Sequence, residues 1–221
     1  MEKGFAEVNG TQLYFEVSGS GDPIVLIHGG FGDRRYWDEQ FKVFAKSNKV
    51  VRYDVRGFGK SSLPIQGERY SHHEDLKALL EYLEIPKAHI AGFSMGCGLA
   101  IDFVLAYREM SNSLIAVGPW VIGYTSPSAE NLFKELGKID SILNKSGRIQ
   151  AAEYFVNAPF FDPERISTEL KNRITEIVNG YTFWHWLNKD PCRYVNPQAV
   201  EQIDRISLPT LIMTAEYDIE P

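Results

Sequence analysis

The chain has 221 residues, with 23 Lys and Arg against 29 Asp and Glu, so its formal net charge is −6 at pH 7. This acidic balance argues against a nucleic-acid-binding protein, because such proteins need a basic surface that replaces condensed counterions. Hydrophobic residues make up 44% of the chain, which excludes global disorder.

No apolar run reaches the roughly 18 residues that a membrane span needs. The N-terminus lacks the charged-then-apolar order of a secretory signal. Two cysteines form no disulfide framework. We therefore expect a cytoplasmic protein that does not interact with membranes.

Short β-rich runs alternate with helical patterns, an order typical of an α/β fold with a mostly parallel sheet and helices on both faces. Residues 6–17 alternate around Asn9-Gly10, which predicts a β-hairpin. Residues 24–27 form a continuous apolar run, which predicts a strand buried on both faces. The remaining expected elements are strands at 49–53, 89–91, 113–117 and 209–215 and helices at 33–46, 71–83 and 95–107.

Strands give way to helical patterns between residues 123 and 196, with expected helices at 131–143, 148–156 and 163–178. This segment is typical of a helical cap inserted between two strands. We therefore divide the chain into the N-terminal part of a core (1–122), a cap (123–196) and the C-terminal part of the core (197–221). The aromatic residues of the cap either line a pocket or form its own small core: Phe155, Phe160, Phe161, Tyr181, Phe183, Trp184 and Trp186.

The pattern Gly92-Phe93-Ser94-Met95-Gly96 lies between an expected strand and an expected helix. A serine on such a sharp turn projects its hydroxyl from the sheet edge, and side chains two residues away on either side would collide with the turn. The helix N-terminus also stabilises developing negative charge. Ser94 is therefore a candidate nucleophile. The alternative is a glycine-rich turn with an idle serine.

A second glycine loop, His28-Gly29-Gly30, follows the first buried strand. We expect the backbone N–H of Gly30 and that of Met95 to form an oxyanion hole, in which two donors stabilise a tetrahedral intermediate. His28 precedes the candidate nucleophile and belongs to the loop, so we interpret it as a structural residue.

The chain resembles the α/β-hydrolase fold family, which includes small esterases, lactonases and proline iminopeptidases. Four segments carry the resemblance in the order of the family and across essentially the whole chain: Ile27-His28-Gly29-Gly30, Asp54-Val55-Arg56-Gly57-Phe58-Gly59, Gly92-Phe93-Ser94-Met95-Gly96 and Leu211-Ile212-Met213-Thr214-Ala215-Glu216-Tyr217-Asp218. The resemblance implies a triad in the order Ser, acid, His.

The resemblance places the acid of this triad at Asp218, with Glu216 as a nearby competitor. Asp218 would hold the imidazole in the required tautomer. We also expect Phe31, which replaces a proline common at this position in relatives, and Trp120 to contact the substrate.

The histidine of the triad is missing, because all five histidines precede Asp218. The last strand and helix of the family pattern are missing too, so we expect the 209–215 strand to be a sheet edge with an exposed apolar face. The chain is either a truncated piece of a longer hydrolase, a shortened natural product that has lost activity, or an enzyme in which His185 of the cap substitutes. We expect the 221-residue chain to be near-inactive.

These observations predict a serine hydrolase that acts on a small carboxylic ester, lactone or thioester through an acyl-enzyme on Ser94. A small molecule is then the expected partner. Acyl transfer on serine needs no cofactor, and no His-x₃-His or Cys-x₂-Cys spacing predicts a metal site. A non-catalytic small-molecule receptor or pseudo-enzyme of the same fold is the alternative.

Overall fold

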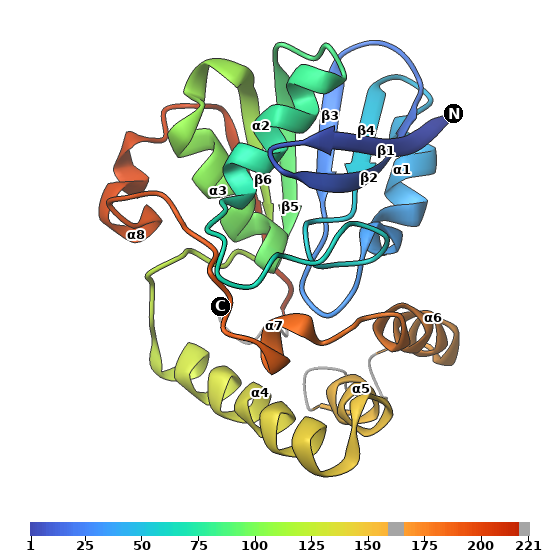
Figure 1. Ribbon diagram of the computed structural model, residues 1–221. Helices are drawn as coiled ribbons and strands as arrows, with labels where there is room; N and C mark the ends of the chain where they lie inside the picture. The colour runs from blue at the N-terminus through green and yellow to red at the C-terminus, as the bar shows by residue number, and fades with distance from the viewer. Residues whose placement is uncertain (159–165, 217–221) are drawn as a thin grey trace.

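The protein forms a seven-stranded sheet with helices on both faces and a group of helices at one end (Figure 1). The computed structural model describes residues 1–158 and 166–216. The strand order is β1-β2-β4-β3-β5-β6-β7; β2 pairs antiparallel with both β1 and β4, and the neighbours from β4 to β7 pair in parallel. The strands are β1 (Glu2–Val8), β2 (Thr11–Ser18), β3 (Pro23–Ile27), β4 (Lys49–Tyr53), β5 (Ala88–Phe93), β6 (Ser111–Val117) and β7 (Thr210–Met213).

The predicted hairpin joins β1 to β2 through Asn9 and Gly10, which have φ of 47° and 67°. Two consecutive positive φ values match the right-handed twist of the flanking strands, which explains the Asn-Gly pair. Strand β2 then pairs antiparallel with β4, so the hairpin extends the parallel sheet by two strands, of which β2 runs against its neighbours.

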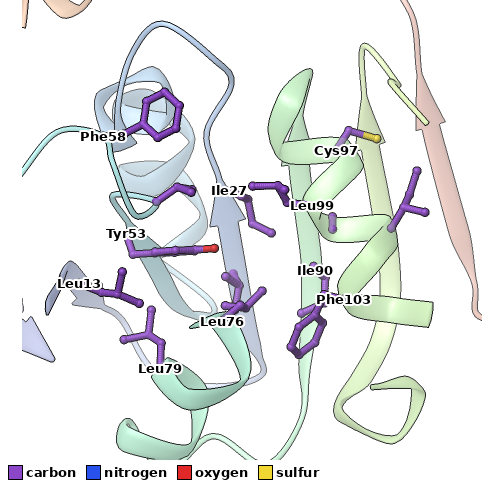
Figure 2. Close-up of a cluster of buried hydrophobic side chains, with 14 of the residues drawn as sticks. Leu13, Ile27, Tyr53, Phe58, Leu76, Leu79, Ile90, Cys97, Leu99 and Phe103 are labelled. Carbon is purple, nitrogen blue, oxygen red and sulfur yellow. The ribbon is translucent and has the colours of Figure 1, made fainter. Parts of the chain in front are cut away.

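The parallel strands carry apolar residues on both faces, as predicted. In β3, Val25 and Ile27 belong to the cluster under α2 and α3, whereas Leu26 packs with Trp37 and Phe41 on the opposite face. Figure 2 shows the first of these clusters, with side chains from the strands meeting those of α2 and α3. A continuous apolar run is therefore needed in β3, because neither face meets water.

The core helices match the predicted ones, apart from their ends. Residues 33–46 form a 3₁₀ turn followed by a short α-helix, because the Asp33 side chain accepts from the Arg35 N–H and begins a tight turn. The helices of the core are η1 (Arg34–Trp37), α1 (Asp38–Phe44), α2 (His72–Tyr82), α3 (Met95–Ala106), η2 (Arg108–Met110), α8 (Ala199–Gln202) and η4 (Ile203–Arg205).

The first four described helices after β6, α4 to α7, gather at the end of the sheet (Figure 1). Ser126 caps the first of them by accepting from the Ala129 N–H, and Gly147 ends it with φ of 88°. We call these helices the cap and keep 123–196 as its proposed boundaries. They are α4 (Pro127–Ser146), α5 (Arg148–Val156), α6 (Thr168–Asn179) and α7 (Trp184–Leu187).

Several cap and core elements differ from the expected ones at their ends. Helix α4 spans Pro127–Ser146 instead of 131–143. Helix α6 begins at Thr168, where the Ser167 side chain accepts from the Leu170 N–H, rather than at 163. Residues 163–165 lie outside the described part of the chain. Strand β7 ends at Met213, two residues before the predicted end.

Strand β7 lies at the end of the described sheet, next to β6 alone. Its residues are exposed on both faces, and the side chain of Ile212 is 63% accessible. The expected edge strand with exposed apolar residues is therefore confirmed for the described residues. Across residues 1–158 and 166–216, no helix combines the length and apolarity that crossing a bilayer requires.

Candidate active site

Ser94 occupies a strained turn between β5 and α3. Its φ of 53° and ψ of −117° are rare for a residue with a side chain, and such a conformation costs about 1–3 kcal/mol. The Ser94 N–H donates to the Val117 carbonyl at 2.9 Å, and the Ser94 carbonyl accepts from the Cys97 N–H at 2.8 Å. These bonds hold the residue between β6 and the start of α3. Its side chain is half-buried and does not cap the helix.

The two glycines of the pattern leave no room for a side chain. A Cβ on Gly92 would lie 2.1 Å from the Gly96 carbonyl oxygen, and a Cβ on Gly96 would lie 2.3 Å from the Ile27 carbonyl oxygen. The first turn of α3 thus packs directly against the backbone at the end of β3. Backbone atoms cannot rotate away as side chains do, so glycine is required at both positions.

The loop after β3 lies beside this turn. Strands β3 and β5 pair in parallel, with Ile27 opposite Gly92. A Cβ on Gly29 would lie 2.9 Å from the Phe93 ring, and one on Gly30 would lie 3.9 Å from the Met95 side chain. Gly30 and Met95, the two predicted oxyanion donors, are therefore neighbours in space. The N–H of Met95 belongs to the first turn of α3, where backbone donors have no partner within the helix.

His28 is a structural residue of this loop. The side chain is fully buried, and both ring nitrogens have backbone partners. The Val55 N–H donates to Nε2 at 3.0 Å, so Nδ1 carries the proton and donates to the Gly29 carbonyl at 2.8 Å. Burial lowers the pKa of His28 and keeps it neutral. Its hydrogen bonds join the end of β3 to the turn after β4. Because both ring nitrogens are engaged in these bonds, neither is free to act as a catalytic base.

A buried ion-pair network lies next to the loop after β3. Arg34 binds Glu16 through Nε at 2.9 Å and Asp54 through Nη1 at 2.9 Å. Burial acts to raise the pKa of Glu16, but hydrogen bonds from Arg34 and Arg52 outweigh it and lower that pKa. Asp54 is fully buried, and a Cβ on Gly59 would lie 2.3 Å from its Oδ2. These contacts give the segment 54–59 a structural role, which sequence reasoning did not find.

None of the five histidines hydrogen-bonds to the Ser94 hydroxyl. His89 binds Ser113 through Nδ1 at 2.7 Å, but both residues lie near the starts of β5 and β6, at the opposite end of the strands from Ser94. His72 and His73 begin α2. Asp218, the predicted acid, lies outside the described residues, and its neighbour Glu216 is exposed.

His185 packs at the junction of the cap with the core. Its ring stacks on Phe58 with centroids 4.4 Å apart, and a hydrogen bond of 3.0 Å joins its Nδ1 to the Tyr181 hydroxyl. Its Cε1 lies 2.4 Å from the position that a Cβ on Gly57 would take. Burial lowers its pKa to about 4. These contacts give His185 a packing environment beside the turn after β4.

Phe31 and Trp120, the two predicted substrate contacts, lie in different surroundings. The side chain of Phe31 is only 9% exposed and stacks on Phe155 of α5, with ring centroids 4.0 Å apart. Trp120 follows β6 and is half-buried, and its ring centroid lies 6.3 Å from that of Phe133 in α4. Their roles in substrate binding stay predictions.

The cap aromatics pack mainly against the core. Phe155, Tyr181 and Phe183 are buried in the same cluster as the strands, and Trp186 packs partly against it. Phe160 and Phe161 lie outside the described residues. Burial raises the pKa of the Cys97 thiol to about 11, in keeping with packing rather than chemistry. Within the two described ranges, no three His, Cys, Asp or Glu side chains gather as metal ligands would.

Known proteins resemble the chain over nearly its full length. The model of the alpha/beta hydrolase fold family matches residues 22–219. A putative non-heme chloroperoxidase from Synechocystis is 29% identical over 93% of this chain and 77% of its own length. A putative carbamate hydrolase from Azorhizobium caulinodans is 30% identical over 97% of this chain and 80% of its own.

Solved structures show the same fold. An esterase from Thermogutta terrifontis superimposes with a TM-score of 0.72 at 22% identity, over 100% of this chain and 83% of that structure.

Proposed function

Because the chain belongs to the alpha/beta hydrolase fold family, we propose that Ser94 is the nucleophile of a serine hydrolase that acts on a small carboxylic ester, lactone or thioester. The observation that carries the proposal is the strained turn of Ser94, built by two glycines that admit no side chain and set beside the glycine loop after β3. The relative named as a putative carbamate hydrolase supports a hydrolase function.

The proposed reaction proceeds through an acyl-enzyme. The Ser94 hydroxyl attacks the carbonyl carbon, and the N–H groups of Gly30 and Met95 stabilise the oxyanion of the tetrahedral intermediate. The intermediate collapses with loss of the alcohol or thiol and leaves the acyl group on Ser94. Water then attacks this ester and regenerates the serine. Trp120, whose carbonyl oxygen lies 3.2 Å from the position of a Cβ on Gly98 in α3, contacts the acyl group in this proposal.

Both steps need a base, and among the described residues no histidine hydrogen-bonds to the Ser94 hydroxyl; His28, His89 and His185 have other partners. A serine hydroxyl without a base is a poor nucleophile at neutral pH. An oxyanion hole and substrate binding without a working triad still give roughly 10³–10⁴-fold acceleration over water in a well-studied enzyme. We therefore propose that the 221-residue chain acylates slowly and turns over more slowly still.

The test uses an activated electrophile and an external base. A fluorophosphonate should modify Ser94, detected by mass spectrometry of the tryptic peptide, and Ser94→Ala should abolish the adduct. Ser113→Ala is the matched control, because the Ser113 hydroxyl has a histidine partner, His89. It should leave the labelling unchanged. An adduct on Ser113, or none on Ser94 after prolonged incubation, would contradict the proposal.

Turnover is measured separately with p-nitrophenyl acetate. The wild-type chain should release one equivalent of p-nitrophenol in a burst and then hydrolyse slowly. Added imidazole should raise the rate of hydrolysis after the burst. This increase should be at least ten times the increase that imidazole causes with Ser94→Ala. Rapid turnover without imidazole that depends on Ser94 would disprove the slow-turnover part of the proposal.

Among the described residues no side chain hydrogen-bonds to the Ser94 hydroxyl, which also favours a second candidate, a small-molecule receptor or pseudo-enzyme. Such a protein binds an acyl compound without multiple turnover. Calorimetric titration with a ketone analogue of p-nitrophenyl acetate separates the two functions. Stoichiometric binding together with no stimulation of ester hydrolysis by imidazole would favour the receptor.

A further inference from the structure

We infer that Phe31 is a positioning residue through which the cap sets the orientation of the Gly30 N–H. This inference rests on the proposed function, in which that N–H binds the oxyanion. Phe31 follows Gly30 directly, so any rotation of the backbone at Phe31 changes the peptide plane that neighbours the donor.

Phe31 has φ of 59°. This left-handed region is unfavourable for a bulky residue, because its Cβ approaches the backbone too closely. Such conformations persist only where the surroundings hold them, and they concentrate at functional sites. Four further non-glycine residues share a positive φ among the described residues, and one of them is Ser94. The two strained residues thus lie on the two adjacent loops that form the candidate site.

The contacts that hold the Phe31 ring come from the cap. Among the described residues, four aromatic rings surround it, and all four belong to the segment from α5 to α7. The closest is Phe155, stacked at 4.0 Å with an interplanar angle of 20°. The others have centroids at 5.4 Å for Trp186, 5.8 Å for Tyr181 and 6.1 Å for Phe183.

The cap also contacts the residue after Phe31. A Cβ on Gly32 would lie 2.8 Å from Cγ2 of Ile177 in α6 and 2.2 Å from the Tyr36 ring. On the other side, Gly29 packs against the Phe93 ring and Gly30 lies beside Met95, both part of the serine turn. The short segment 29–32 is therefore held at one end by the serine turn and at the other end by the cap.

The consequence is a coupling between cap packing and the chemical step. When the stack on Phe155 is weakened, the left-handed conformation of Phe31 is no longer held, and the Gly30 N–H loses its fixed direction. Ground-state binding of a substrate depends less on that direction than the transition state does, because negative charge develops on the oxygen only during attack. Weakening the stack should therefore slow the reaction without weakening binding.

The experiment compares three variants with the wild-type chain by the kinetics of fluorophosphonate labelling. Phe155→Leu should lower the maximal labelling rate at least tenfold and leave the half-saturating probe concentration within twofold. Phe155→Tyr keeps the stacked ring and should retain at least half of the wild-type rate. Phe15→Leu is the matched control, because Phe15 is a buried aromatic residue that packs edge-on against Tyr82 instead of the cap. It should label at the wild-type rate.

A second readout does not depend on labelling. Amide hydrogen exchange at Gly30 and Gly32, followed by NMR, should accelerate at least fivefold in Phe155→Leu and remain unchanged in Phe15→Leu. If the wild-type chain takes up no probe, the proposed function fails, and exchange alone then decides the role of Phe31. Unchanged exchange at these glycines, unchanged labelling of Phe155→Leu, or equal slowing in Phe155→Leu and Phe15→Leu would each overturn the inference.

Discussion

Strands β5 and β7 lie on either side of β6 in one parallel sheet, but their apolar residues have opposite surroundings. Ile90 of β5 is completely buried, whereas Ile212 of β7 is 63% exposed. Strand β5 has β3 and β6 as neighbours and α3 packed over it. Strand β7 pairs with β6 alone among the described residues. An apolar run therefore indicates a strand, but its neighbours determine how much each side chain contributes to stability.

Because β5 and α3 are buried whereas β7 is exposed, we expect a larger side chain at the junction of β5 and α3 to destabilise the protein strongly. Gly96→Ala places a Cβ 2.3 Å from the Ile27 carbonyl oxygen, where only backbone could move. We expect the free energy of unfolding to fall by about 3 kcal/mol or more, in the range of severe steric substitutions. Fluorophosphonate labelling of Ser94 should be lost as well. Chemical denaturation measures the first effect and mass spectrometry the second.

Two other helical glycines provide matched controls. A Cβ on Gly98 would lie 3.2 Å from the Trp120 carbonyl oxygen, so Gly98→Ala should cost no more than about 1 kcal/mol. A Cβ on Gly137 in α4 would meet nothing within 4 Å. Gly137→Ala should therefore stabilise the protein by about 0.5–1 kcal/mol. Wild-type stability of Gly96→Ala would show that the serine turn has more room than its contacts imply.

The burial of α3 also predicts an unusual dependence of stability on pH. Asp102 on this helix is 1% exposed, its Oδ2 accepts from the Val195 N–H at 3.2 Å, and its Oδ1 has no hydrogen-bond partner within the described part of the chain. Burial raises the pKa of Asp102 to about 6, from an ordinary value of 3.8. The folded chain thus holds this proton more tightly than the unfolded chain does. Its contribution to stability is present below about pH 4 and is lost as the pH rises to about 6.

The variant Asp102→Asn tests this contribution, because it stays neutral and keeps an oxygen that can accept from Val195. Two pKa units correspond to about 3 kcal/mol. Relative to the wild type, the variant should gain roughly that amount in free energy of unfolding between pH 4 and pH 7. The exposed Asp204→Asn is the control and should follow the wild-type profile. Parallel profiles for Asp102→Asn and the wild type would mean that the carboxyl is better solvated than its burial indicates.

The sequence predicted those parts of the fold and site that depend on local spacing. The hairpin follows from Asn9-Gly10, the serine turn from Gly92 and Gly96, and the buried strand from its apolar run. Each depends on residues only a few positions apart, so the backbone conformation is set locally. The structure bears out all three elements.

Features that depend on distant contacts were not predicted. The sequence did not reveal that the Phe31 ring packs against residues more than a hundred positions later, and its contact with substrate stays a prediction. The bridging of Glu16 and Asp54 by Arg34 likewise joins three separate segments. Neither periodicity nor a motif encodes such contacts, because side-chain direction depends on what the rest of the fold places nearby.

The smallest expected effect comes from β7 and completes the comparison with β5. Ile90→Val removes one buried methylene and should cost about 1 kcal/mol, whereas Ile212→Val should change the free energy of unfolding by less than about 0.3 kcal/mol, because water already surrounds this side chain. Ile212→Lys should also leave stability nearly unchanged and should reduce concentration-dependent light scattering, because a charge on an edge strand opposes pairing with a second chain. A loss above about 1 kcal/mol in either Ile212 variant would show that β7 is covered in solution. Ile212 would then contribute to the free energy of unfolding as Ile90 does, although different elements pack against β7 and β5.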